Sequence, residues 1–304
     1  MSKRKNKKLT LGLIALIFIL SAVLTTSFSG DSGNIMDFFG LRDSDTQPEG
    51  VMTVDFIDVG QGDCTLIIQN HTVILVDGGE SGEADTVINF LKNKGITEID
   101  CCIATHPHSD HIGSLSDVFA EFDVKDVIMP EIPEKLIPTS KSYERFLKAL
   151  ETCVENVYPA QAGESYEYGK IKIELLGPVK KYDNLNDMSI VSRIIYENTS
   201  VLLTGDAETP AEKDILKRGA DCTADLLKIG HHGSRTSSCD EWLKVVNPQY
   251  AVISCGADND YGHPHKQLIK RLEKTEIDYY RTDLIGTVSF KSDGSRFTLI
   301  NAES

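Results

Sequence analysis

The chain has 304 residues, 40% of them hydrophobic, which is enough to bury one large core. Its formal net charge is −15, from 46 acidic and 31 basic residues, and such an acidic balance counts against indiscriminate binding of duplex nucleic acid. Its 7 cysteines are scattered without pairing spacings, which argues against a disulfide scaffold.

The N-terminal region has the pattern of an export segment. Residues 2–8 are strongly basic and an apolar run follows over residues 9–24, so residues 1–29 are expected to be a signal peptide or an N-terminal membrane anchor. The basic start predicts that the rest of the chain is exported and lies outside the cell, free or anchored to the outer face of the cytoplasmic membrane. Residues 30–50 are polar and predict a linker, which leaves residues 51–304 for one folded domain.

From residue 51 onward, hydrophobic periodicity predicts strands that alternate with helices. Strands are expected at 52–58, 64–69, 72–76, 99–104, 126–129, 171–176, 191–196, 200–204, 225–229, 250–254, 287–291 and 296–300. Helices are expected at 84–94, 113–121, 141–152, 208–217, 238–246 and 265–274. Residues 171–175 and 201–203 are expected to form a hairpin. The segment from Lys135 to Tyr168 is expected to be a long insert that builds substrate walls.

The most informative motif follows the predicted strand at 99–104, where His106, His108, Asp110 and His111 lie within six residues. A strand that ends in a tight loop can aim alternate side chains at one point. His106 and His108 are therefore expected to face one metal ion, and Asp110 and His111 a second. Imidazole and carboxylate are ligands that Zn, Mn and Fe accept, and this density favours a metal site over a histidine-rich surface loop.

Three other predicted strands end in groups that suit the same site. Asp206 follows the strand at 200–204, His231 and His232 follow the strand at 225–229, and Asp77 follows the strand at 72–76. Taken singly, each is an ordinary turn, since Gly and Asp are common turn residues. Four strands that all end in metal-binding or metal-orienting groups indicate one centre.

These residues resemble the metallo-β-lactamase superfamily, and more narrowly the metallo-hydrolase domain of the bacterial competence protein ComEC. The resemblance covers about residues 50–300 and rests on the segments 55–63, 203–208, 230–234, 261–264 and 281–287, together with the histidine cluster. It implies an α/β (α+β) fold, a four-layer αββα sandwich, with the metal centre at the edge where the strands end.

The resemblance also implies a centre for two divalent metal ions, zinc or alternatively manganese. The ligand positions fall on His106 and His108 for the first ion, on Asp110, His111 and His231 for the second, and on Asp206 as the bridge. His232 is the alternative to His231, which is preferred because it is closer to the end of its strand. Asp77 corresponds to an aspartate that braces the metal loop without binding the ion.

One departure from the family pattern concerns the first ion. Most members supply a third histidine between the main cluster and the bridging aspartate, but no histidine occurs between His111 and His231. Asn186 or Asp187 is then expected to approach the metal, or the first site is depleted.

The implied chemistry is hydrolysis by a water that the metal ions activate. Asp110 is expected to orient this water or take its proton. His232 or His263 is expected to hydrogen-bond the developing oxyanion, although His263 also suits a plain turn before a helix. The favoured function is a phosphodiesterase or nuclease of the ComEC-like type, with DNA or a small phosphoester as substrate.

Two other functions stay open on the sequence alone. One is a small-molecule hydrolase acting on a phosphoester, lactone or β-lactam, and the other is a metal-binding module without catalysis. Basic residues along one wall of the cleft, such as Lys228, Arg235 and Lys266, would favour nucleic acid as the substrate. An apolar, lidded pocket would favour a small molecule.

Overall fold

The structure is a computed structural model, and it describes residues 50–302. The predicted signal or anchor at 1–29, with its apolar run at 9–24, lies outside the described residues, as does the predicted linker apart from Gly50. Within residues 50–302, no helix combines the length and the apolar character needed to cross a membrane.

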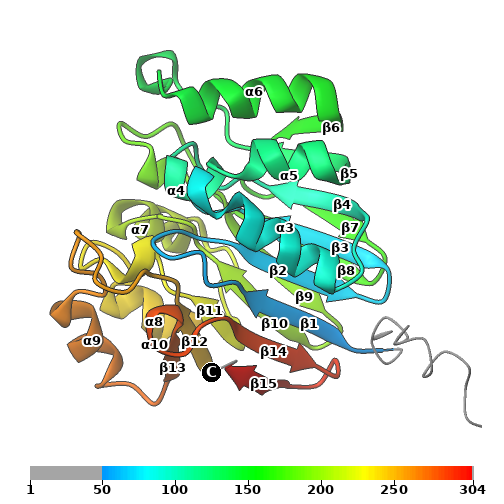
Figure 1. The fold of residues 1–304 in the computed structure, drawn as a ribbon. Helices are drawn as coiled ribbons and strands as arrows, with labels where there is room; N and C mark the ends of the chain where they lie inside the picture. The colour runs from blue at the N-terminus through cyan, green and yellow to red at the C-terminus, as the bar shows by residue number, and fades with distance from the viewer. Residues whose placement is uncertain (1–49, 303–304) are drawn as a thin grey trace, which may run out of the picture. The chain divides into compact units, whose positions relative to one another are not determined.

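Eight strands form one mixed sheet in the order β15-β14-β1-β2-β3-β4-β5-β6 (Figure 1). The strands β1 to β3 and the two C-terminal strands pair antiparallel, whereas β3, β4, β5 and β6 run parallel. Their bounds are Met52–Phe56 for β1, Thr65–Gln69 for β2, Thr72–Val76 for β3, Glu98–Ile103 for β4, Asp123–Met129 for β5, Val154–Pro159 for β6, Val288–Ser292 for β14 and Phe297–Ala302 for β15.

Seven strands form the second sheet in the order β13-β12-β11-β10-β9-β8-β7. Here β10 to β13 run parallel, and β7 to β10 form an antiparallel meander. Their bounds are Ser165–Tyr168 for β7, Ile171–Gly177 for β8, Val191–Tyr196 for β9, Thr199–Leu203 for β10, Leu226–Lys228 for β11, Tyr250–Ile253 for β12 and Asp278–Arg281 for β13.

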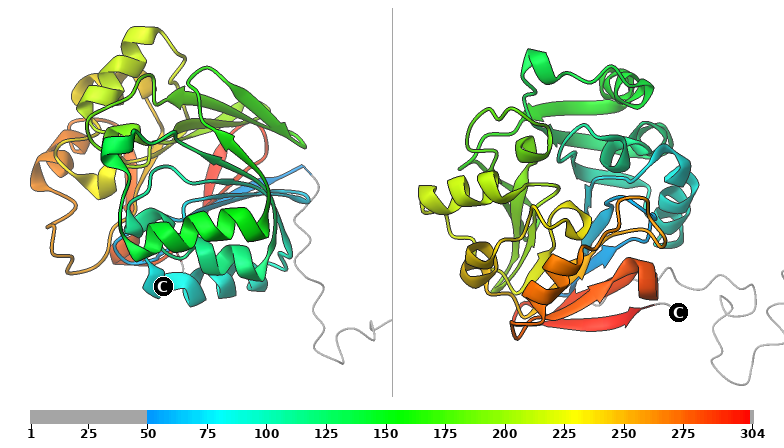
Figure 2. Two further views of the ribbon diagram at one scale, coloured as in Figure 1. Left: turned by 90° about the horizontal axis from the view of Figure 1, so that it is seen from above. Right: turned by 90° about the vertical axis from the view of Figure 1, so that its left-hand side faces the viewer.

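Helices cover the outer faces of both sheets, so the domain has four layers (Figure 2). The helices α3 (Ala84–Asn93), α4 (Ser109–Ile112), α5 (Leu115–Glu121) and α6 (Lys141–Cys153) belong to the first sheet, and α7 (Thr209–Arg218), α8 (Asp240–Val246) and α9 (Lys266–Leu272) to the second. The short α10 (Thr282–Ile285) links β13 to β14, and 3-10 turns lie at Ser81–Glu83, Glu134–Leu136, Asn186–Met188 and His231–Gly233.

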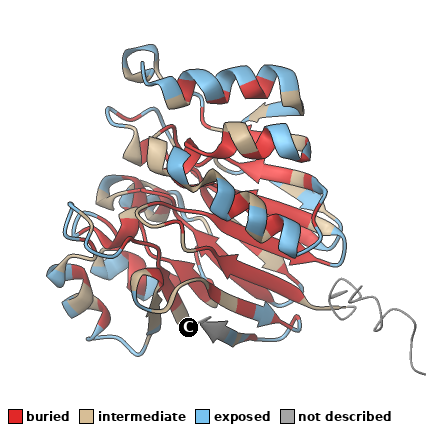
Figure 3. Cartoon of the chain, viewed as in Figure 1, coloured by how far each residue is buried: buried red, intermediate tan, exposed pale blue. Residues whose placement is uncertain are grey.

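Three apolar cores hold these layers together. One lies between the first sheet and its helices, with Phe119 and Phe146, and one lies between the second sheet and its helices, with Trp242. The third lies between the two sheets, with Phe56 and Phe290. Because both faces of each sheet are covered, the central strands are buried throughout, as Figure 3 shows. The structure thus confirms the predicted αββα sandwich.

The sequence located every predicted strand and helix within a few residues, but two expectations were wrong. The segment from Lys135 to Tyr168 is not an insert, because it supplies an edge strand to each sheet. Strand β6 is the edge of the first sheet and β7 the edge of the second, and α6 precedes them in the chain. Residues 171–175 and 201–203 do not pair, because β9 lies between β8 and β10. The strands β6, β7 and β13 were missed because partly exposed, short edge strands carry little apolar signal.

The parallel strands of both sheets place their carboxyl ends at one edge of the sandwich. In the first sheet, Val76 of β3 pairs with Ile103 of β4. In the second sheet, Leu202 of β10 pairs with Leu227 of β11. Ligand sites in open α/β sheets form outside such strand ends, and the loops that follow these four strands carry the predicted site residues.

Candidate metal centre

The loop after β4 turns at once into the short helix α4, and this geometry presents the histidine cluster. His108 has extended backbone angles at the start of α4, and His111 lies one turn later, fully buried. The neighbouring loop approaches closely, since the amide of Asp63 donates to the carbonyl oxygen of Asp110 over 3.1 Å. Gly62 is required there, because a Cβ atom would lie 2.6 Å from that carbonyl oxygen.

Asp206, after β10, lies between two sets of donors. Its Oδ1 is 3.2 Å from His111 Nε2 and 3.5 Å from His232 Nε2. Its Oδ2 is 3.7 Å from His106 Nε2 and 3.7 Å from His231 Nε2.

We call Asp110, His111 and His232 the Oδ1 group, and His106 and His108 the Oδ2 group. In each group the ligand atoms, together with those of Asp206, lie within 4.8 Å of one another. Asp110 Oδ2 is 3.2 Å from His232 Nε2, and His106 Nε2 is 2.9 Å from His108 Nδ1.

The loop after β11 decides which of the paired histidines faces the Oδ1 group. His231 and His232 both have left-handed backbone angles, with φ of 49° and 50°, so the chain reverses sharply between Gly230 and Gly233. The turn directs His232 inward, with its side chain 1% exposed, and leaves His231 at the cavity with 21% exposed. His232, and not the preferred His231, therefore lies beside Asp110 and His111.

Three of the ring nitrogens are held by carboxylates behind them. His111 Nδ1 donates to Asp77 Oδ2 over 2.8 Å, and His231 Nδ1 donates to Glu208 Oε1 over 3.1 Å. His232 Nδ1 lies 3.1 Å from Asp63 Oδ1 and 3.0 Å from the carbonyl oxygen of Ser254. Such contacts fix the tautomer and leave Nε2 free to bind a metal ion.

The bracing residues form a second layer that the sequence only partly revealed. Asp77 accepts from the amide and hydroxyl of Thr105 over 2.8 and 2.7 Å, in agreement with its expected role. Asp63 pairs with Lys228, whose side chain is 3% exposed; the sequence suggests Lys228 only for a basic wall of the cleft and suggests no role for Asp63. The available signal was a lysine inside the apolar run that forms β11, because a buried charge needs a partner.

Electrostatics at the site also favour a cation. Burial raises the pKa of a carboxyl group, but the surrounding imidazoles outweigh this and hold the pKa values of Asp110 and Asp206 below their usual range. Burial lowers the pKa of an imidazole, but Asp206 and Asp63 outweigh it and raise the pKa of His232 to about 10. Burial lowers the pKa values of His106 and His108, which favours their neutral, metal-binding forms.

The donor set fits a divalent metal. His111 Nε2 and Asp206 Oδ1 are buried and, although close, make no hydrogen bond with any partner in the described residues. Such orphaned atoms are costly unless something binds them. Two ligands of one tetrahedral zinc ion lie roughly 3.3 Å apart at the usual bond lengths, and the donor separations above scatter around that value.

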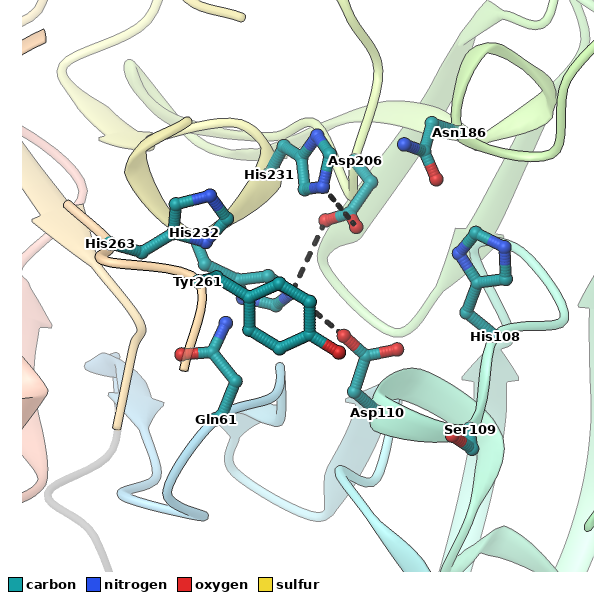
Figure 4. A pocket seen from close by; sticks show the side chains of 10 residues that line it. All are labelled: Gln61, His108, Ser109, Asp110, Asn186, Asp206, His231, His232, Tyr261 and His263. Carbon is teal, nitrogen blue, oxygen red and sulfur yellow. Dashed lines mark hydrogen bonds and ion pairs between the residues drawn. The ribbon is translucent and has the colours of Figure 1, made fainter. Parts of the chain in front are cut away.

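The centre opens into a cavity of about 270 Å³, shown in Figure 4. Asp110, His232 and His263, the residues expected to act in catalysis, all line it. The complete lining is Gln61, His108, Ser109, Asp110, Asn186, Asp206, His231, His232, Tyr261 and His263. His263 is therefore more than a turn residue, because its ring lies close to the histidines of the centre. The ring centroids are 5.5 Å apart for His263 and His231 and 6.2 Å apart for His263 and His232.

Two further expectations concern the walls of this cavity. Asn186 lines it with a buried, unpaired Oδ1, whereas Asp187 is not among the lining residues and accepts from the amide of Glu208 over 3.1 Å. None of Lys228, Arg235 and Lys266 lines the cavity, and Lys228 is buried against Asp63. The basic wall that would favour nucleic acid is therefore missing from the cavity itself.

Comparisons with known proteins agree with this geometry. Residues 57–257 match the family model of the metallo-β-lactamase superfamily. The chain is 30% identical over 258 residues to ComE operon protein 3 of Bacillus subtilis, covering 78% of this chain and 33% of that protein. It is also 30% identical over 247 residues to competence protein ComA of Neisseria gonorrhoeae, covering 80% and 33%. The matched region thus spans about a third of the length of these relatives.

Solved structures share the fold at low sequence identity. The metallo-β-lactamase fold protein YhfI from Bacillus subtilis superposes with a TM-score of 0.54 at 12% identity, covering 80% of this chain and 100% of that one. The residues matched by the family model include both donor groups and Asp206, whereas Tyr261 and His263 of the cavity lining lie beyond the match. The chain belongs to the metallo-β-lactamase superfamily of hydrolases.

Proposed function

We propose that this protein is a metal-dependent phosphodiesterase that holds two divalent metal ions, zinc or manganese, across Asp206. The observation that carries the proposal is the placement of Asp206, whose two oxygens face separate donor groups. Asp110, His111 and His232 are proposed to hold one ion, and His106 and His108 the other, with His231 flanking Asp206 Oδ2. When bound, the ions lower the pKa of a shared water and polarise a phosphoryl oxygen.

The residues around the centre supply the remaining functions. Asp110 is 23% exposed and faces the cavity, so its carboxylate can orient the attacking water while Oδ2 stays beside His232. Burial and the neighbouring histidines lower the pKa of His263 to about 4, so its ring is neutral near pH 7 and can donate one hydrogen bond to a substrate oxygen. The cavity is open and polar rather than apolar and lidded, which suits a phosphate better than a lactam ring.

Similarity to competence proteins supports a phosphodiester of DNA as the target. The second candidate is hydrolysis of a small phosphoester, which is favoured because no Lys or Arg of residues 50–302 lines the cavity. Export, with membrane association through residues 9–24, is also proposed, on the basic and apolar pattern of the N-terminal residues. A reporter enzyme that is active only outside the membrane, fused after residue 50, tests the export.

Metal-stripped full-length protein, reloaded separately with Zn and Mn, tests the activity. The assay compares cleavage of single-stranded DNA with cleavage of bis-p-nitrophenyl phosphate, and His111→Ala serves as the inactive control. Cleavage of both substrates supports a nuclease, and cleavage of the small diester alone supports the second candidate. Two bound ions with no cleavage of either substrate would refute a phosphodiesterase and leave a metal-binding module.

A further inference from the structure

Tyr261 is an exposed aromatic side chain at the rim of the metal cavity. It is 68% exposed, the most of any large apolar or aromatic side chain in the described part of the chain. Among the strongly exposed side chains of this kind, such as Leu284 at 67%, only Tyr261 lines the cavity. Figure 4 shows its ring in front of His232 and beside the carboxylate of Asp110. Single exposed apolar side chains are common on protein surfaces, so its position, not its exposure, raises the question of its role.

The loop that carries Tyr261 is held in place. The side-chain amide of Asn259 donates to the carbonyl oxygens of Gly256 and His263 over 2.8 and 2.7 Å, and its Oδ1 accepts from the amide of His263 over 3.0 Å. These bonds close the loop around the tyrosine. The ring is therefore presented by a fixed segment, which reduces the entropy that a ligand must remove on binding.

One face of the Tyr261 ring is already stacked. It lies at 20° to the ring of His263, with 5.7 Å between centroids. His263 is itself only 9% exposed, so this stack joins the exposed tyrosine to the buried histidines of the centre. The solvent-facing side of the tyrosine ring offers a flat surface to a planar group that continues the stack.

Charge and size indicate which planar group fits. The chain has a net charge of −15, and neither Lys nor Arg lines the cavity within the described residues, so basic side chains there do not supply attraction to a phosphate backbone. The cavity of about 270 Å³ lies below the usual range for sites that enclose a whole ligand of ordinary size. The reacting phosphate can therefore enter, while the group attached to it must lie at the rim beside Tyr261.

We propose that Tyr261 forms a stacking subsite for the nucleobase next to the scissile phosphate, which makes single-stranded nucleic acid the substrate class. This inference rests on the proposed phosphodiesterase function. Base–aromatic stacking tolerates any sequence, because every base has a π-face, and it does not depend on surface charge. A base inside a duplex is stacked on its neighbours and cannot reach the ring, so duplex DNA is expected to be a poor substrate.

The test compares two phosphodiesters that differ only in the base. One is the p-nitrophenyl ester of thymidine 5′-monophosphate, and the other is the same ester with a base-free sugar. Full-length metal-loaded protein is assayed as wild type, Tyr261→Ala, Tyr261→Phe and Leu284→Ala. Tyr261→Phe keeps the ring, and Leu284→Ala removes an equally exposed side chain away from the cavity. The ratio of kcat/KM for the two esters cancels any change that affects both.

We expect the wild type to prefer the base-bearing ester about tenfold, mainly through KM, which is within the range for one stacked base. Tyr261→Phe and Leu284→Ala should keep this ratio, and Tyr261→Ala should reduce it to near one. A wild-type ratio near one, or a ratio that survives in Tyr261→Ala, would overturn the subsite.

A binding measurement separates this inference from the proposed function. Fluorescence anisotropy compares a labelled thymidine tetranucleotide with a base-free tetramer of the same backbone, using the same four proteins. If neither ester is hydrolysed, the phosphodiesterase proposal fails, and the ratio of the two Kd values still decides the subsite. A Kd ratio that falls to near one only in Tyr261→Ala supports stacking, and equal Kd values in the wild type refute it.

Discussion

The Oδ1 group and the Oδ2 group share Asp206 but differ in how firmly their donors are held. In the Oδ1 group, carboxylates of Asp77 and Asp63 lie behind the rings of His111 and His232 at 2.8 and 3.1 Å. In the Oδ2 group, His106 has only the hydroxyl of Thr105 behind Nδ1, at 3.3 Å. His108 has no orienting partner in the described residues apart from His106.

The difference indicates that a single metal loop can carry one pre-arranged site and one weaker site. Partners that orient a ligand typically change metal affinity by about 10–100-fold. The Oδ1 group also has an extra donor in Asp110. We therefore expect one ion to bind tightly in the Oδ1 group and the other to bind more loosely in the Oδ2 group.

The largest expected effect comes from removing a donor of the braced group. His111→Ala should abolish the tight ion and lower hydrolysis by more than about a hundredfold, since losing a ligand costs at least as much as losing its orienting partner. His108→Ala should keep one tightly bound ion. Isothermal titration calorimetry and elemental analysis of the two variants measure this contrast, and equal stoichiometry in both would remove the distinction between the groups.

The next effect concerns the buried Asp63–Lys228 pair behind His232. Asp63→Asn should weaken the tight ion by about 10–100-fold, because the ring of His232 loses its carboxylate. It should also destabilise the metal-free protein by about 3–5 kcal/mol, because Lys228 is left buried without its partner. Chemical denaturation in the presence of a chelator, together with metal titration, checks both effects.

Matched variants show whether the pair or the lysine alone matters. The double variant Asp63→Leu/Lys228→Met should be less destabilised than the sum of the single variants, because it leaves no unpaired buried charge. The partly exposed pair of Lys125 and Asp100, 2.8 Å apart, is the control, and Lys125→Met should cost no more than about 1 kcal/mol. Equal costs at the two lysines would mean that Lys228 is not effectively buried.

Much of the fold and of the metal centre could be predicted because the relevant patterns lie within short segments of the sequence. Four apolar strands that are followed by histidine or aspartate predict the edge at which the centre lies, and the resemblance to the superfamily implies the sandwich. The motif around His106 and His108 predicts converging donors without knowledge of any other segment. Hydrophobic periodicity also located the buried strands, since burial on both faces gives long apolar runs.

Other features depend on contacts that the sequence does not record. The choice between His231 and His232 follows from left-handed backbone angles at both residues, which reverse the order expected from distance along the chain. Asp63 and Lys228 are far apart in sequence and meet only when the two sheets pack together. Edge strands such as β6 are partly exposed and show no clear alternation, which is why the sequence pattern predicts an insert there.

A smaller effect is expected at His231, which flanks Asp206 Oδ2 without joining the closely spaced donors. Its Nε2 lies 3.7 Å from that oxygen and its Nδ1 is held by Glu208, so it can take the place of the missing third histidine. His231→Ala should weaken the looser ion about tenfold and leave the tight ion nearly unchanged. Asn186→Ala is the comparison on the same cavity wall. If that variant alone weakens binding of the looser ion, Asn186 and not His231 completes the Oδ2 group.

The smallest effect on the metal centre is expected at Glu212, a buried carboxyl group outside it, whose substitution should leave metal binding unchanged. Glu212 of α7 is buried and accepts from the amides of Ser238 and, over 3.0 Å, Cys239 at the start of α8. Burial raises the pKa of Glu212 from 4.5 to about 7, because charge is costly there. Protonated Glu212 is thus favoured in the folded state, and the associated stability is present below pH 4.5 and lost as pH rises to 7.

Glu212→Gln keeps the shape and removes the titration. The stability of the metal-free wild type should therefore fall relative to this variant between pH 4.5 and 7, by at most about 3.5 kcal/mol at ~1.4 kcal/mol per pKa unit, and then stay level. Chemical denaturation in the presence of a chelator across this pH range measures the difference in the free energy of unfolding between the two proteins. The histidines of the centre contribute equally to both proteins, so their titration cancels in this difference. A constant offset between the two curves would show that Glu212 is already ionised in the fold. In that case the pH dependence of stability in this window belongs to other titratable groups, among them the histidines of the centre.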